Sequence, residues 1–236
     1  MLTRRLIQFI NNSLERRTGY RLQPSADFRL SHARMDILKK IGCNFVVDAG
    51  ANIGQWALQL RKSGYGGEIL SYEPSNLFSK LNDKVRRDPL WEARHCALLD
   101  YKGSTTLFYS SNDGLSSSTK KPNRILEHGL GISFPESYPV SVVRLDQEVS
   151  GKENLYLKLD VQGSEMQALL GAKGVIENIG AIEFESSLID LYENEVSHYE
   201  IAKWLSSYGF KPLQLVITHW DKSLRTISLD SIFIRK

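Results

Sequence analysis

Apolar positions near the start of the chain recur every three or four residues. This spacing predicts an amphipathic helix over residues 2–17. Its apolar positions are Leu2, Leu6, Phe9, Ile10 and Leu14. Pro24 and Ser25 interrupt the pattern, and a further helix is expected over about 31–41.

Beyond residue 44, short apolar runs alternate with segments of helical spacing. Strands are predicted near 45–49, 68–73, 92–97, 155–160 and 180–185. This alternation indicates an α/β domain with a doubly wound parallel sheet. Two further strand patterns, at 210–218 and 226–235, are joined by a short turn and predict a C-terminal antiparallel hairpin. We therefore expect an N-terminal helical appendage over residues 1–40 and one domain over 41–236.

The chain has 236 residues, of which 42% are hydrophobic and 24% charged, as in a globular protein with a sizeable core. Positive charge gathers in residues 1–40, which hold nine Lys and Arg against three acids. This basic helix is a candidate for peripheral membrane binding or self-association, although a solvated helix face is the simpler interpretation. The two cysteines form no disulfide framework. Since no apolar run reaches the roughly 20 residues of a membrane span, we expect a cytoplasmic protein.

The segment 45–56 carries the strongest local signal, because an apolar strand runs into Asp48 and then into Gly50 and Gly54. Glycines at such a turn let a small molecule approach the backbone closely. Glu73 follows at the end of the second apolar run, and Pro74 ends that strand. A carboxylate there can accept hydrogen bonds from both ribose hydroxyls. Together these residues predict a nucleoside-containing cofactor.

The glycine loop also discriminates between cofactors. A dinucleotide fingerprint needs three glycines, but counting from Gly50 this chain has Asn52 and Gln55 at the other two positions. S-adenosylmethionine has no phosphate, and the loop amides and Asp48 could hold its amino acid moiety. Small residues at a later strand end, Cys96–Ala97, leave room for adenine. An NAD(P)-dependent oxidoreductase stays as the alternative enzyme, and a non-catalytic nucleoside-binding scaffold protein as the alternative of another class.

Charged residues interrupt two apolar strands near their predicted carboxyl ends. Lys158 and Asp160 share one face of one strand, and Glu183 and Glu185 share one face of the next. A central parallel strand is normally apolar on both faces, and its carboxyl end is where open α/β sheets bind ligands. Mutual pairing of the buried charges is the alternative to a functional role.

Four motifs resemble those of the FkbM family of S-adenosylmethionine-dependent methyltransferases. They are Val47–Gly54, Tyr72–Pro74, Cys96–Asp100 and, most specifically, Leu157–Glu165 with its K-x-D-x-[EQ]-G-x-E pattern. The resemblance runs from about Phe45 to the C-terminus. It implies a Rossmann-like class I methyltransferase fold, with a seven-stranded, mostly parallel sheet closed by the C-terminal hairpin. It also implies O-methylation of a sugar or polyketide-type metabolite. Gln162 stands where many members have Glu.

The combined reading is an S-adenosylmethionine-dependent O-methyltransferase acting on a small-molecule acceptor, with no nucleic acid partner expected. The predicted cofactor-binding residues are Asp48, Gly50, Asn52, Gly54, Glu73, Cys96 and Ala97. The predicted catalytic residues are Asp160, Lys158 and Glu185. His198 and His219 are weaker candidates for a base. Asp160 and Glu185 without a third ligand do not establish a metal site.

The serine-rich segment Ser110–Thr119 is long enough to form a loop over a site, and its hydroxyls would suit hydrogen bonding to a polar acceptor. A plain solvated loop is an equally good interpretation of this composition.

Overall fold

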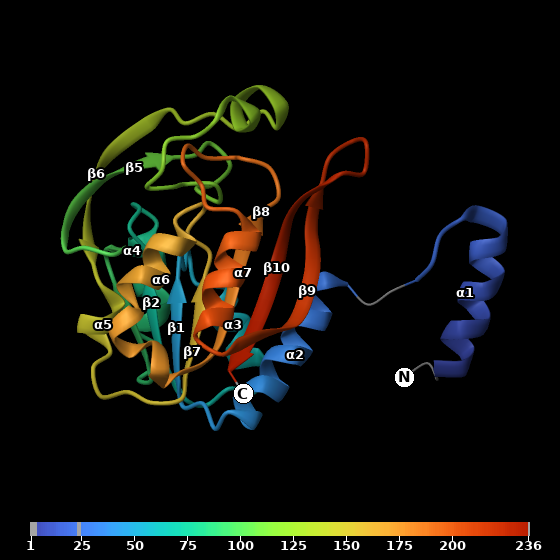
Figure 1. Cartoon of the computed structure of the whole chain (residues 1–236), viewed down its shortest axis with the longest axis horizontal. Coiled ribbons are helices and arrows are strands. Elements are labelled where there is room, and N and C mark those ends of the chain that lie inside the picture. The colour runs from blue at the N-terminus through green and yellow to red at the C-terminus, as the bar shows by residue number, and fades with distance from the viewer. Residues whose placement is uncertain (1–3, 23–24, 236) are drawn as a thin grey trace.

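The computed structural model describes residues 4–22 and 25–235, and its centre is a seven-stranded sheet of order β3-β2-β1-β7-β8-β10-β9 (Figure 1). Its strands are β1 (Phe45–Ala49), β2 (Glu68–Tyr72), β3 (Trp91–Arg94), β7 (Leu155–Leu159), β8 (Ile179–Ser187), β9 (Phe210–Trp220) and β10 (Thr226–Arg235). Neighbouring strands run parallel except β10, which is antiparallel to both β8 and β9. The predicted sheet and its terminal hairpin are confirmed.

Helices cover both faces of this sheet, because successive strand residues point to opposite sides. Val47 and Leu157 pack in one core cluster, whereas their neighbours Val46 and Tyr156 pack in another. The first cluster includes residues of α5 (Leu145–Glu148), α6 (Glu165–Gly171) and α7 (His198–Ser207). The second includes residues of α2 (Ala26–Lys40), α3 (Gln55–Lys62) and α4 (Phe78–Val85). The result is a three-layer sandwich with the sheet in the middle.

A second, three-stranded sheet of order β4-β6-β5 lies above the carboxyl ends of the main strands (Figure 1). It comprises β4 (Ala97–Leu98), β5 (Gly103–Tyr109) and β6 (Glu136–Val143). The strand predicted at 92–97 therefore divides, because β3 ends at Arg94 and Ala97 begins a strand of the second sheet. Most residues of β5 and β6 are partly or fully exposed, so these strands lack the apolar run that revealed the buried ones.

The short helices η1 (Ile125–Gly129) and η2 (Lys173–Asn178) complete the elements that the structure describes. Of the two N-terminal helices, α1 (Arg4–Thr18) lies apart from the domain in Figure 1. Leu2, part of the predicted apolar stripe, falls outside the described residues. Helix α2 begins several residues before the predicted start, because the Ser25 hydroxyl accepts a hydrogen bond from the Phe28 amide at 3.2 Å.

Helix α2 packs into the domain. Leu30, Ile37 and Leu38 are buried in the second core cluster. The division at residue 40 stays a prediction, but α2 shares its core with the sheet.

A buried ion pair ties α2 to the central sheet. Arg34 Nε donates to Glu183 Oε2 at 2.7 Å, and Arg34 Nη2 donates to Glu183 Oε1 at 2.5 Å. The Tyr156 hydroxyl donates to the same carboxylate at 2.6 Å. The two charged side chains are 8% and 4% exposed, so each is the main compensation for the other's lost hydration.

The loop after β1 lies in direct contact with the end of β7. Gly50 has φ +75°, and a Cβ atom added there would come within 1.8 Å of the Asp160 carbonyl oxygen. The adjacent Asp160 amide donates to the Ala49 carbonyl at 3.0 Å. Position 50 therefore needs glycine both for its backbone conformation and for the space between two strand ends.

We predict that Arg34→Met lowers the free energy of unfolding by about 3–5 kcal/mol, because it strands the buried Glu183 carboxylate. Urea denaturation at neutral pH measures the change. Arg94→Met is the matched control, since Arg94 pairs with Glu92 at 48% and 66% exposure; it should cost less than about 1 kcal/mol. Equal losses in the two variants would contradict the buried role of Arg34.

We also predict that Gly50→Ala destabilises the protein by about 1–3 kcal/mol more than Gly209→Ala, because only the former is forced against backbone. Gly209 has a similar φ of +83° but nothing within 4 Å of an added Cβ, so it reports the conformational strain alone. Thermal and urea unfolding of the two variants give the comparison. Similar losses would show that the loop yields at no cost.

Candidate cofactor and acceptor site

A cavity that is partly open to solvent lies at the carboxyl ends of β1, β2 and β7. Of the predicted cofactor-binding residues, its wall contains Gly50, Asn52, Glu73, Cys96 and Ala97. The structure thus brings together positions from three separate strand ends. This is the edge at which open parallel sheets bind ligands.

The Glu73 carboxylate is fixed at the cavity wall by two backbone amides. It accepts from the Asn52 amide at 2.7 Å and from the Ser75 amide at 2.8 Å. Glu73 is 6% exposed, and this burial raises the pKa of its carboxyl group. The hydrogen bonds from Ser75 and Asn52 lower that pKa. Asn52 adopts φ +50°, which turns its amide toward Glu73. A carboxylate oriented in this way can accept further hydrogen bonds from hydroxyl groups.

Asp48 and Gly54 lie behind the cavity wall instead of forming part of it. Asp48 is fully buried, with Oδ1 at 3.2 Å from Lys158 Nζ and Oδ2 accepting from the Ser71 hydroxyl at 3.3 Å. At Gly54, the residue before α3, an added Cβ would meet the Trp91 ring at 2.8 Å. Both residues support the loop, and their direct contact with a cofactor stays a prediction.

Lys158 and Asp160 both line the cavity, as their shared strand face predicted. Lys158 Nζ lies 3.4 Å from Asp160 Oδ2 and donates to the Gly50 carbonyl at 3.3 Å. Burial by itself lowers the pKa of Lys158, but the Asp160 and Asp48 carboxylates outweigh it, so that the pKa is raised. Asp160 is the more accessible residue of this ion pair, with 38% of its side chain exposed.

Glu185 lines a smaller hollow of about 270 Å³ that shares Trp56, Lys158 and Asp160 with the main cavity. Gln162 connects the two spaces, since its Nε2 donates to Asp160 Oδ1 at 2.8 Å and to Glu185 Oε2 at 3.0 Å. Burial, followed by the Asp160 charge, raises the pKa of Glu185. The two predicted catalytic carboxylates, Asp160 and Glu185, are thus joined by one amide.

Asp230 lines the same hollow from β10. Burial and the neighbouring acids, first of all Glu185, raise its pKa to about 8. The hollow therefore concentrates acidic side chains on one side of Lys158.

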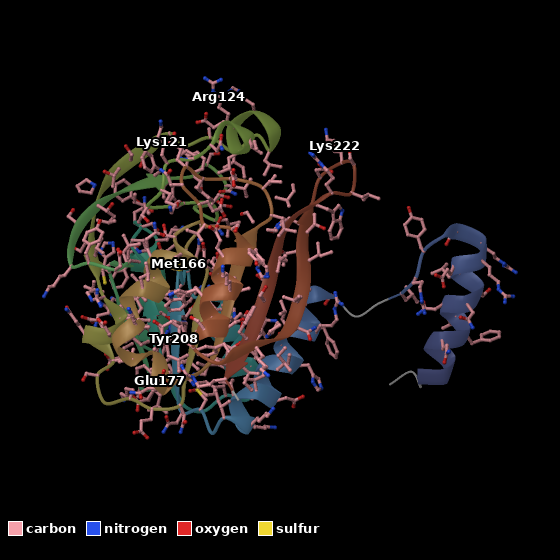
Figure 2. The ribbon with its side chains drawn as sticks, in the orientation of Figure 1. Lys121, Arg124, Met166, Glu177, Tyr208 and Lys222 are labelled. Carbon is pink, nitrogen blue, oxygen red and sulfur yellow. The ribbon has the colours of Figure 1, made fainter. Side chains whose placement is uncertain are left out.

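The serine-rich segment folds over the cavity, where Gly114, Leu115, Ser117, Ser118 and Thr119 contribute to its wall. Hydrogen bonds to residues outside the segment hold it in place. The Ser118 hydroxyl donates to the Gln162 carbonyl at 2.6 Å, and the Tyr192 hydroxyl donates to the Ser116 carbonyl at 2.9 Å. Figure 2 shows Lys121 and Arg124, which follow this segment in the chain, at the end of the domain opposite to Glu177 and Tyr208.

Sequence reasoning did not identify Trp56 and Tyr192 as parts of this region. Trp56 lines both spaces, and the Tyr192 hydroxyl, whose single proton is shared with the Ser116 carbonyl, lies 3.0 Å from Gln162 Oε1. Trp56 directly follows the glycine loop, on the first turn of α3, and this position could have indicated that it lies at the site. Tyr192 lies 30 residues beyond Gln162 in an irregular segment, where no pattern pointed to it.

The two histidines weighed as bases lie outside the cavity wall. His198 Nδ1 is 2.8 Å from the Ser186 hydroxyl, and burial lowers its pKa. His219 Nδ1 is 3.7 Å from Glu185 Oε1, close to the smaller hollow.

Within residues 4–22 and 25–235, no group of three or more His, Cys, Asp or Glu side chains is arranged to hold a metal ion. No helix in the described part of the chain has the length and apolar character of a membrane span.

The cavity has the parts that a nucleoside with an amino acid moiety requires. Leu98, Leu99 and Leu107 form an apolar part of the wall that could contact a base, and the Glu73 carboxylate could accept hydrogen bonds from hydroxyl groups. The side-chain-free backbone at Gly50 allows close approach to the loop. The donor and acceptor set therefore fits S-adenosylmethionine.

Residues 48–212 match the sequence profile of the methyltransferase FkbM domain. Among solved structures, the chain resembles a putative S-adenosylmethionine-dependent methyltransferase from Listeria monocytogenes, with a TM-score of 0.50, 11% identity and coverage of 87% of this chain and 97% of that one. It also resembles magnesium protoporphyrin IX methyltransferase from Synechocystis PCC 6803, with a TM-score of 0.46, 11% identity and coverage of 97% and 96%. Comparison with curated proteins gives no match.

The profile match covers more than half of the chain and includes three of the four motifs on which the resemblance was based in full, and the fourth from Asp48 onward. The protein therefore belongs to the FkbM family of S-adenosylmethionine-dependent methyltransferases, with the class I fold and the cofactor that its sequence predicted.

Proposed function

We propose that the protein transfers a methyl group from S-adenosylmethionine to a hydroxyl of a small-molecule acceptor, a sugar or a polyketide- or glycolipid-type metabolite. One observation carries the proposal. Asp160, with 38% of its side chain exposed, stands at the cavity wall and is held by Lys158 at 3.4 Å. A carboxylate beside a cofactor cavity is the kind of group that an alcohol needs, because an alcohol oxygen is a poor nucleophile at neutral pH.

Each part of the cavity wall has a proposed role in cofactor binding. Glu73 would accept hydrogen bonds from the ribose, and the loop around Gly50 and Asn52 would hold the amino acid moiety. The strand end at Cys96–Ala97 would contact adenine. When bound, S-adenosylmethionine supplies a methyl group activated by its sulfonium charge. The protein's remaining task is to align the acceptor with that methyl group, and such positioning is a major source of rate enhancement.

The predicted catalytic residues divide this task. Asp160 would take the proton of the acceptor hydroxyl as the oxygen becomes a nucleophile. Lys158 would hold the orientation of Asp160, since its ammonium is buried against both Asp48 and Asp160. Glu185 would act from the neighbouring hollow, through the hydrogen bonds of Gln162.

The family assignment favours methyl transfer over the nicotinamide-dependent alternative, and Asn52 at the middle loop position agrees with this choice. The non-catalytic scaffold is the outcome that the binding and activity measurements below would reveal. A cytoplasmic location and membrane binding or self-association through α1 remain proposals. So does the absence of a nucleic acid partner.

We predict that the protein binds S-adenosylhomocysteine and that Glu73→Gln weakens this binding at least about tenfold, the effect of losing one charge-assisted hydrogen bond. Isothermal titration calorimetry measures both affinities. Glu68→Gln is the matched control, because Glu68 lies at the other end of β2 and pairs with Lys152 at the surface; its affinity should equal that of the wild type. Binding of NAD but not of S-adenosylhomocysteine would overturn the proposed function.

Once metabolite profiles of a deletion strain have identified the unmethylated acceptor, Asp160→Asn should slow methyl transfer by about 10²–10⁴-fold, as expected on loss of a general base. Single-turnover assays with saturating cofactor and acceptor separate this effect from binding. Asp36→Asn, on the exposed surface of α2, controls for loss of a carboxylate. Full turnover in Asp160→Asn would exclude Asp160 as the base.

A further inference from the structure

Gln162 occupies a constrained backbone position immediately after β7. Its φ of +50° lies in the left-handed region that residues other than glycine seldom adopt. Its carbonyl accepts the Ser118 hydroxyl at 2.6 Å, which fastens this turn to the serine-rich segment. The side chain therefore starts from an anchored backbone and projects between the main cavity and the smaller hollow.

The amide of Gln162 uses all of its donors and its acceptor. Nε2 donates to Asp160 at 2.8 Å and to Glu185 at 3.0 Å, while Oε1 lies 3.0 Å from the Tyr192 hydroxyl, whose single proton is shared with the Ser116 carbonyl. A neutral side chain with two N–H donors and one carbonyl is an amide. A glutamate at this position could accept from Tyr192 but could not bridge two carboxylates while ionised.

The need for such a bridge follows from the surrounding charges. The titratable groups around Glu185 and Asp160 come from seven elements and one loop: Asp48 (β1), Lys158 (β7), Glu183 (β8), Asp230 (β10), His219 (β9), Arg34 (α2), Glu165 (α6) and Tyr192. Carboxylates outnumber permanent cations in this set. Lys158 is divided between Asp48 and Asp160, and Arg34 is engaged by Glu183.

Glu185 has no permanent cation of its own among the described residues. Within the described residues its only cationic neighbour within 4.0 Å is His219, at 3.7 Å and charged only when protonated. Its hydrogen-bond donors are the Ser228 hydroxyl at 3.0 Å and Gln162. The neutral amide thus replaces a cation between two acidic groups.

We propose that Gln162 is a positioning residue, which holds the Asp160 and Glu185 carboxylates together as a pair where the main cavity meets the smaller hollow. The proposal rests on the proposed function for its purpose, since it assigns a role on the acceptor side of the same site. The direction in which Gln162 changes the pKa of Glu185 follows from its hydrogen bond. Burial and the Asp160 charge raise the pKa of Glu185, and the hydrogen bond from Gln162 lowers it. Removal of the amide should therefore make Glu185 protonate at higher pH.

The direct test is a ¹³C-carboxyl NMR titration of the full-length protein, with the Glu185 signal identified by its loss in Glu185→Gln. Gln162→Leu should raise the titration midpoint of Glu185 by about one pH unit or more, because a charge-assisted hydrogen bond is lost. Gln162→Glu should raise the midpoint as well, since a third carboxylate joins the pair. Gln147→Leu and Gln147→Glu, on the exposed surface of α5, are the matched controls and should leave it unchanged.

An unchanged Glu185 midpoint in Gln162→Leu and Gln162→Glu would overturn the proposal. Gln162→Glu preserves the size of the side chain and its contact with Tyr192, so it carries the test if Gln162→Leu does not fold. Calorimetry with S-adenosylhomocysteine separates this result from the larger question. If the wild-type protein does not bind S-adenosylhomocysteine, the proposed function is refuted. The titration tests the role of Gln162 independently of that result.

Activity supplies a second readout once the acceptor is known. In Gln162→Leu, the acidic limb of the pH–rate profile should move to higher pH together with the Glu185 midpoint. A merely structural role would lower the rate by the same factor at every pH, and that result would also count against the proposal.

Discussion

Buried charges on neighbouring strands are the constraint on which this structure depends. Asp48, Lys158 and Glu183 lie in register across β1, β7 and β8, on a sheet whose other central residues are almost entirely apolar. An unpaired charge in such a place would cost several kcal/mol. Asp48 is therefore paired with Lys158, and Glu183 receives Arg34 from outside the sheet. The cavity lies beside this row, where Lys158 and the more exposed Asp160 form part of its wall.

The same constraint links the second N-terminal helix to the cofactor cavity. Arg34 lies over the Trp56 ring at 5.3 Å, and Trp56 stacks on Tyr156 at 6.3 Å between ring centres. Because Trp56 lines both the cavity and the hollow, α2 supports a wall that would otherwise rest on α3 alone. A helix that the sequence suggested as part of an appendage thus supports the architecture of the site.

Some left-handed backbone conformations occur where strands end and the cavity begins. Gly50, Asn52 and Gln162 all have positive φ, and each turns a backbone or side-chain group toward a partner on another strand. Gly50 does so by lacking a side chain, Asn52 by presenting its amide to Glu73, and Gln162 by bridging Asp160 and Glu185. The strain at Asn52 and Gln162 is compensated by hydrogen bonds that also arrange the functional groups.

Local patterns in the sequence determined which segments form the buried strands, and which acids stand at their ends. Glu73, Lys158 and Asp160 could be predicted because each interrupts an apolar run at a strand terminus, and strand periodicity alone assigns the face. The second sheet, built from exposed strands, left no such pattern. Only the tertiary structure decided that Asp48 lies behind the cavity and that Glu185 opens into a separate hollow. The reason is that burial and pairing depend on which strands and loops become neighbours, and those neighbours are tens of residues apart in the chain.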